Sequence, residues 1–111
     1  MPYIKEKRRE VLDHHINMSS EVIKSNINKE FSKDNITDEE FLQICGDINY
    51  FVSRMINQIA QDVSYGKICL ITGVLENIKQ EFYRRVASSY EDIKITENGD
   101  IREYLRYKNG R

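Results

Sequence analysis

Hydrophobic residues recur every three or four positions between residues 37 and 60, with polar residues between them. This spacing lines up apolar side chains along one face of an α-helix. The stretch opens with Thr37-Asp38-Glu39-Glu40, a capping-box signature in which Thr37 and Glu40 satisfy each other's backbone N–H groups. The pattern predicts an amphipathic helix over about 38–60, with its apolar face at Phe41, Ile44, Cys45, Ile48, Val52, Met55, Ile56 and Ile59.

Two further stretches show the same period. Residues from about 7 to 27 carry apolar side chains at Val11, Leu12, Ile16, Val22, Ile23 and Ile27. Residues from about 65 to 89 carry them at Ile68, Ile71, Leu75, Ile78, Phe82 and Val86. A short polar break separates this third helix from the second, and Ser64 is suited to cap it. Long amphipathic helices joined by short loops pack antiparallel, so we expect a three-helix antiparallel bundle.

The spacing of apolar residues changes after Tyr90, where apolar and polar residues alternate on both sides of an Asn98-Gly99 step. Asn and Gly tolerate the positive φ of a type I′ turn, so the pattern predicts a small β-hairpin over about 93–105. The basic end, residues 106–111, is expected to be a mobile tail. The predicted fold class is therefore mainly α, a three-helix antiparallel bundle with a C-terminal β-hairpin, in a single domain over residues 1–111.

Charge and composition narrow the classes of function. The chain has 111 residues, 17 basic and 18 acidic, and a net charge of -1, which gives no overall attraction to nucleic acid or to anionic membranes. No stretch reaches the roughly 20 apolar residues of a membrane span, and the polar start lacks the apolar part of a secretory signal. We expect a cytoplasmic protein, with Cys45 and Cys69 as buried thiols.

The polar side of the second predicted helix carries a first group of candidate residues. Asp47, Tyr50 and Arg54 stand at i, i+3 and i+7 and so share one face, with Asn49 beside them. An ordinary solvated face with ion pairs explains this arrangement as well as a binding face does. Gly46 favours the binding face, because glycine destabilises a helix interior by about 1 kcal/mol unless another backbone or a ligand comes close.

The end of the third predicted helix carries a second group. Glu81 and Arg85 form a favourable i, i+4 pair, which leaves Tyr83, Arg84 and Tyr90 without a local explanation. Guanidinium groups bind phosphate or carboxylate in bidentate fashion and phenols stack on planar rings, so this cluster fits an anionic, partly planar ligand or a partner surface. The alternative is a structural network that holds the predicted hairpin to the helix end. Glu76 lies on the polar face of the same predicted helix, near Gly73.

The chain lacks the motifs of known catalytic sites. It has no phosphate-binding loop, no nucleophile elbow and no zinc-protease signature, so we predict no catalytic residue, metal site or cofactor. The alternative is a magnesium-dependent nucleotide hydrolase. The all-helical enzymes of this kind need several carboxylates that converge from two helices, a set that Asp47, Glu76 and Glu81 could imitate only by accident.

Six blocks of the chain resemble, in the same order, a family of small uncharacterised proteins of phages and prophages. They are Pro2-Tyr3-Ile4, Gly46-Asp47-Ile48-Asn49-Tyr50, Gly73-Val74-Leu75-Glu76, Glu81-Phe82-Tyr83-Arg84-Arg85-Val86, Tyr90-Glu91-Asp92 and Glu97-Asn98-Gly99-Asp100. The family often has proline before the Tyr-Glu-Asp step where this chain has Ser89, which favours a longer helix here. The resemblance implies a phage accessory factor that binds a host protein or sequesters a nucleotide signal of antiviral defence, and it supplies no mechanism.

We therefore expect a non-enzymatic, homo-oligomeric binding module for an anionic, partly planar ligand, with a nucleotide or cyclic nucleotide as the first candidate. The arginines would take phosphate, the tyrosines would stack, and the acidic and amide side chains would orient the arginines or read base edges. A factor that binds a host or phage protein through the same face is the alternative. The expected ligand-binding residues are Asp47, Asn49, Tyr50, Arg54, Glu76, Tyr83, Arg84 and Tyr90.

Overall fold

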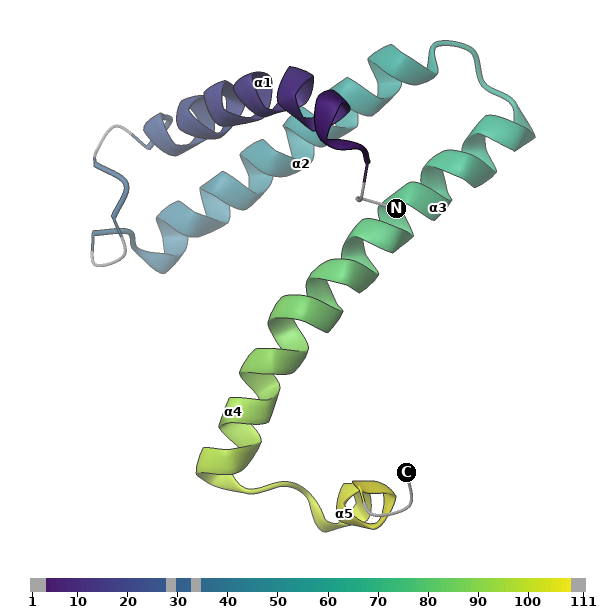
Figure 1. The fold of residues 1–111 in the computed structure, drawn as a ribbon. Coiled ribbons are helices and arrows are strands. Elements are labelled where there is room, and N and C mark those ends of the chain that lie inside the picture. The colour runs from purple at the N-terminus through teal and green to yellow at the C-terminus, as the bar shows by residue number, and fades with distance from the viewer. Residues whose placement is uncertain (1–3, 28–29, 33–34, 109–111) are drawn as a thin grey trace. The chain divides into compact units, whose positions relative to one another are not determined.

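The computed structural model describes residues 4–27, 30–32 and 35–108, and every regular element in these residues is helical. Figure 1 shows their course along the chain. In order they are α1 (Glu6–Ser25), α2 (Asp38–Ala60), α3 (Tyr65–Phe82), the π-helical turn η1 (Tyr83–Ala87), α4 (Ser88–Asn98) and α5 (Arg102–Lys108). The chain divides into two compact units between residues 71 and 72.

The first unit is built on the helix pair α1 and α2, which pack against each other. The chain turns back after α1, so that α2 returns alongside it (Figure 1). Asn26, directly after α1, donates a hydrogen bond from Nδ2 to Oδ2 of Asp47 in α2 at 3.2 Å. The apolar side chain of Ile44 in α2 is 4 % exposed, and it is the one buried residue in the described part of the chain.

The start of α2 confirms the predicted capping box. The backbone N–H of Glu40 donates to Oγ1 of Thr37 at 3.1 Å, and the N–H of Thr37 donates to Oε1 of Glu40 at 3.0 Å. These bonds satisfy two of the N–H groups that a helix leaves without partners at its start. The predicted bounds of 38–60 are those observed for α2.

Ser64 caps α3, as its sequence position indicates. Its hydroxyl accepts from the backbone N–H of Lys67 at 3.2 Å, and its carbonyl accepts from the N–H of Ile68 at 2.9 Å. The chain reaches this cap through Gln61, whose φ is 53°. Lys67 adds a hydrogen bond from Nζ to the carbonyl of Ala60 at 2.8 Å, which satisfies an acceptor at the end of α2.

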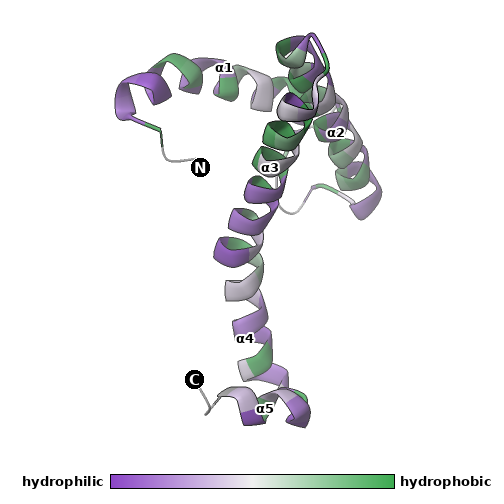
Figure 2. Cartoon of the chain, turned by 90° about the vertical axis from the view of Figure 1, so that its right-hand side faces the viewer, coloured by the Kyte–Doolittle hydropathy of each residue, from purple (hydrophilic) through white to green (hydrophobic). Residues whose placement is uncertain are grey.

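In the second unit, α3 continues through η1 into α4, so the helical segment runs to Asn98 and past the predicted end near residue 89. Figure 2 shows hydrophobic and hydrophilic bands alternating along α3 and α4, the expected appearance of amphipathic helices. The helical run through Ser89 agrees with the extension expected from the absence of proline there.

The predicted β-hairpin is wrong, because residues 93–98 belong to α4 and residues 102–108 to α5. Gly99 has φ 85° and ψ 164°, a conformation open essentially to glycine alone, and its N–H donates to the carbonyl of Ile95 at 2.7 Å. The residue expected to form a hairpin turn instead ends a helix, which also favours glycine. Arg106 to Lys108 lie in α5, and the remainder of the predicted tail lies outside the described residues.

The predicted three-helix antiparallel bundle is also wrong. While α1 and α2 pack together, the apolar positions of α3 stay at least 40 % exposed at Ile68, Leu75, Ile78 and Phe82. A spacing of three and four residues identifies an apolar helix face but does not identify what covers that face. The sequence pattern therefore did not reveal that the apolar positions of α3 are exposed.

Candidate functional site

The first group of predicted residues lies on α2, in the first unit. Asp47 accepts a hydrogen bond from Asn26, and this bond holds the segment directly after α1 against α2. Asn49 accepts a hydrogen bond at Oδ1 from the Ser53 hydroxyl at 3.3 Å, one helical turn further on. Of the three residues predicted to share this face of α2, Asp47 therefore has a structural role. Tyr50 and Arg54 remain available to bind a ligand or a partner.

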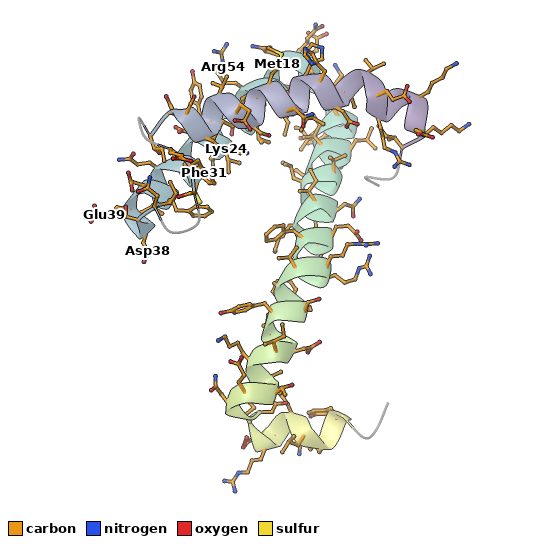
Figure 3. All side chains as sticks on the ribbon, turned by 60° about the vertical axis from the view of Figure 1, so that its left-hand side comes forward. Met18, Lys24, Phe31, Asp38, Glu39 and Arg54 are labelled. Carbon is orange, nitrogen blue, oxygen red and sulfur yellow. The ribbon has the colours of Figure 1, made fainter. Side chains whose placement is uncertain are left out.

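Tyr50 and Arg54 lie together on the outer side of α2. The guanidinium carbon of Arg54 is 5.9 Å from the centre of the Tyr50 ring, within the range of a cation–π contact. Arg54 projects outward from its helix, away from Lys24 and Phe31, which meet where the chain leaves α1 (Figure 3). An open hollow of about 500 Å³ lies beside the pair, lined by Tyr50, Ser53, Arg54, Asn57 and Gln58.

Ser53, Asn57 and Gln58 were not among the predicted site residues. The signal was present, because positions 50, 53, 54 and 57 follow the i, i+3, i+4, i+7 spacing of one helix face. Asn57 is held in place by a hydrogen bond from its Nδ2 to the carbonyl of Ser53 at 2.7 Å. The hollow thus combines a guanidinium, a phenol and amide groups.

The second group lies in the second unit, around a carboxylate that two arginines share. Arg84 Nη2 donates to Oε1 of Glu81 at 2.6 Å, and Arg85 Nε donates to Oε2 of the same residue at 2.9 Å. The Glu81 side chain is 25 % exposed, while the two arginine side chains are mostly exposed. Arg84, the residue expected to bind phosphate, is therefore engaged with a carboxylate of its own helix.

The two predicted tyrosines of this cluster also have neighbours on the same helical segment. The Glu91 carboxylate accepts the hydrogen bond of the Tyr83 phenol, and this bond and its negative charge raise the pKa of Tyr83 above 10.0. Lys94 Nζ lies 5.5 Å from the centre of the Tyr90 ring. These contacts favour a structural network within the helical segment over a preformed anion site, and the hairpin that the predicted network was expected to hold is absent from the described residues.

The π-helical turn lies at the centre of this cluster, and no feature of the sequence was interpreted as predicting it. The N–H of Ser88 donates to the carbonyl of Tyr83, five residues back instead of four. Such a turn holds one residue more than an α-turn and is common at functional sites. In a regular helix Glu91 would lie about 80° around from Tyr83, and the additional residue turns it back toward the phenol.

Glu76 and the two helix glycines complete the predicted set. Oε1 of Glu76 accepts from Nε2 of Gln80 at 2.8 Å and lies 3.8 Å from Nζ of Lys79, an exposed helix-surface arrangement. A Cβ atom built on Gly46 or on Gly73 would meet nothing within 4 Å. Within its own unit, neither glycine is therefore approached closely by a described residue, and the expected reason for each is not observed.

The predicted residues divide evenly between the two units. Asp47, Asn49, Tyr50 and Arg54 belong to the unit that ends at residue 71. The residues of the unit that begins at 72 are Glu76, Tyr83, Arg84 and Tyr90.

Apolar surface is the largest feature that the site predictions missed. A groove of about 370 Å³ runs between α1 and α2, lined by Leu12, His15, Ile16, Ser19, Ser20, Ile23, Ile48, Phe51, Val52 and Met55. In the second unit, six side chains at helical spacing along α3, η1 and α4 are 40 to 65 % exposed. We call this set the apolar stripe, and its members are Leu75, Ile78, Phe82, Val86, Tyr90 and Ile93.

Three further observations on the described residues bear on other classes of site. No group of three or more His, Cys, Asp or Glu side chains in residues 4–27, 30–32 and 35–108 could hold a metal ion. None of the helices in these ranges is both long enough and apolar enough to cross a membrane. Cys45 and Cys69, expected to be buried, are both exposed.

Comparison with known proteins gives one match. The family model described as Domain of unknown function (DUF6899) matches residues 1–101. No curated protein matches the chain, and no solved structure matches it. The expected resemblance to an uncharacterised family is confirmed at this level, and the match gives no information on a phage origin.

Proposed function

We propose that this chain, which belongs to the DUF6899 family, is a non-enzymatic interaction module that works as an assembly of its own copies. One observation carries the proposal: among the described residues only Ile44 is buried, and apolar side chains lie exposed along both units. Monomeric proteins rarely expose large contiguous apolar patches, and those that exist usually mark interaction sites.

The charge of the chain favours a second copy as the partner. With 17 basic and 18 acidic residues, two copies carry almost no net repulsion. Proteins of near-zero net charge associate more readily than strongly charged ones. A partner of opposite charge is not required, so self-association is the simplest form of the assembly.

The concentration dependence of thermal unfolding tests this proposal. If folding is coupled to association, raising the protein concentration 100-fold should raise the unfolding midpoint by roughly 5 to 10 °C. Circular dichroism at 222 nm over that range provides the measurement. A cooperative transition whose midpoint does not change with concentration would contradict the proposal, because a monomer unfolds independently of concentration.

A second proposal, binding of an anionic and partly planar ligand, is favoured by the hollow beside Tyr50 and Arg54. A guanidinium over a phenol can hold a phosphate while the ring stacks on a base, so nucleotides and cyclic nucleotides are the first candidates. If the chain comes from a phage, a nucleotide signal of antiviral defence would be the ligand to test first.

Thermal shift with a panel of linear and cyclic nucleotides at about 1 mM tests the second proposal, since a ligand that binds the folded state raises its midpoint. Arg54→Gln should abolish the shift. Arg84→Gln is the matched control and should retain it, because Arg84 is engaged by Glu81. A panel that shifts nothing, or a shift that survives Arg54→Gln, would remove Tyr50 and Arg54 as the site.

A further inference from the structure

We propose that the apolar stripe pairs with the same stripe of a second copy, antiparallel, about a two-fold axis near residue 84. This inference rests on the proposed self-association and names the surface that performs it. All six side chains of the stripe belong to the second unit, on the continuous helical segment α3, η1 and α4. Phe82, near its middle, is 65 % exposed.

The π-helical turn aligns the centre of the stripe. Leu75 and Ile93 are 18 residues apart, which is five full turns of a regular α-helix, so the stripe follows one broad face of such a helix. The additional residue of η1 turns the later positions back by about 100°. Val86 and Tyr90 therefore lie close to the line of Phe82, while Ile93 lies about 80° to one side of it.

The spacing of the stripe is the same in both directions. From Leu75 to Ile93 the steps are three, four, four, four and three residues. An antiparallel copy turned about residue 84 therefore brings apolar side chains of the two copies to the same heights along the helix axis. The central contacts pair Ile78 with Tyr90 and Phe82 with Val86, and Leu75 and Ile93 lie at the two ends of the contact. This self-complementarity is what a two-fold symmetric interface requires.

The charges that flank the stripe complement each other in this arrangement. Lys79 and Glu91 lie on one flank, and antiparallel pairing brings Lys79 of one copy within about 3 Å along the helix axis of Glu91 of the other. On the other flank, Glu81 comes equally near to Arg85 of the second copy, so two carboxylates and two guanidinium groups surround the axis. Such flanking pairs set the partner and direction of helix pairs.

Paired charge substitutions at the centre of the stripe test this geometry. Phe82→Lys or Val86→Glu alone places two unpaired charges in the interface and should weaken dimerisation at least about 100-fold. A mixture of the two variants should dimerise again, because the lysine introduced at position 82 of one copy then meets the glutamate introduced at position 86 of the other. The opposite contact, between Val86 of the first copy and Phe82 of the second, is retained. Sedimentation equilibrium measures all three samples, with Asn77→Lys, an exposed position off the stripe, as the matched control.

The outcomes separate this inference from the proposed function. If the wild type associates and neither single variant weakens it, another surface forms the assembly, and the inference fails while the proposed function stands. A wild type that is monomeric at all concentrations overturns both. If the single variants weaken association but the mixture does not recover it, the antiparallel pairing is wrong.

Spin labels give a second test that leaves the stripe intact. In a background with Cys45→Ser and Cys69→Ser, nitroxides are attached to Asn77→Cys or to Asn98→Cys, and the distance between copies is measured. Because these positions lie 7 and 14 residues from the axis, antiparallel pairing makes the distance at 98 about 20 Å longer than at 77. Equal distances would contradict it.

Discussion

Arg84 Nη2 lies 2.6 Å from Oε1 of Glu81, one helical turn earlier on the same segment. This contact favours one of two interpretations of the cluster at residues 81–91. An arginine held by a carboxylate of its own helix is not a prepared phosphate site, because a ligand would have to displace that carboxylate. The cluster is therefore better explained as part of the helix that presents the apolar stripe.

Removing the shared carboxylate should destabilise the chain slightly. Glu81→Gln abolishes two exposed helix ion pairs, each worth about 0.2 to 0.5 kcal/mol, so we expect the free energy of unfolding to fall by about 0.5 to 1 kcal/mol. Urea denaturation at low salt measures the change, which should shrink at high salt. Glu76→Gln, whose lysine partner is 3.8 Å away, is the control and should have the smaller effect. A larger loss for the control would contradict this assignment.

The phenol of Tyr83 should titrate above its ordinary range near pH 10. The hydrogen bond to Glu91 and its negative charge favour the neutral phenol, so Glu91→Gln should lower the pKa of Tyr83. The difference in absorbance at 295 nm between wild type and Tyr83→Phe isolates this titration.

The same shift sets the direction of a pH dependence. A folded-state pKa above the unfolded value contributes stability below the unfolded pKa, and that stability is lost as pH rises through the folded pKa. Wild type should therefore lose stability above pH 10 more steeply than Tyr83→Phe. Identical alkaline profiles would contradict the contact with Glu91.

Two glycines should respond in opposite ways to alanine. Gly46 lies inside α2 with nothing within 4 Å of an added Cβ, so Gly46→Ala should stabilise the chain by about 0.5 to 1 kcal/mol. Gly99 has φ 85°, so Gly99→Ala should destabilise it. Chemical denaturation measures both. A loss of stability in Gly46→Ala would indicate that a partner approaches α2 there.

Local interactions explain which parts of the fold were predictable. The capping box and the length of α2 depend on side chains that bond to backbone groups three residues away, and these were predicted correctly. Gly99 was misinterpreted because hairpin turns and helix ends both favour residues that tolerate positive φ. The hydrogen bond from Gly99 N–H to the carbonyl of Ile95 identifies it as a helix end.

Interactions between distant residues explain what the sequence did not reveal. Asp47 was expected at a binding face, but its partner Asn26 lies 21 positions away, and no spacing rule connects them. Tyr50 and Arg54, one turn apart, were placed together correctly.

The mass of the purified chain in solution tests the account most directly. Sedimentation equilibrium from low to high micromolar concentration should show a mass that rises from that of a single copy, 13.2 kDa, toward twice that value. This result is expected because the apolar stripe would be covered by a second copy. A mass of 13.2 kDa at every concentration would show that no second copy is needed and would contradict the account.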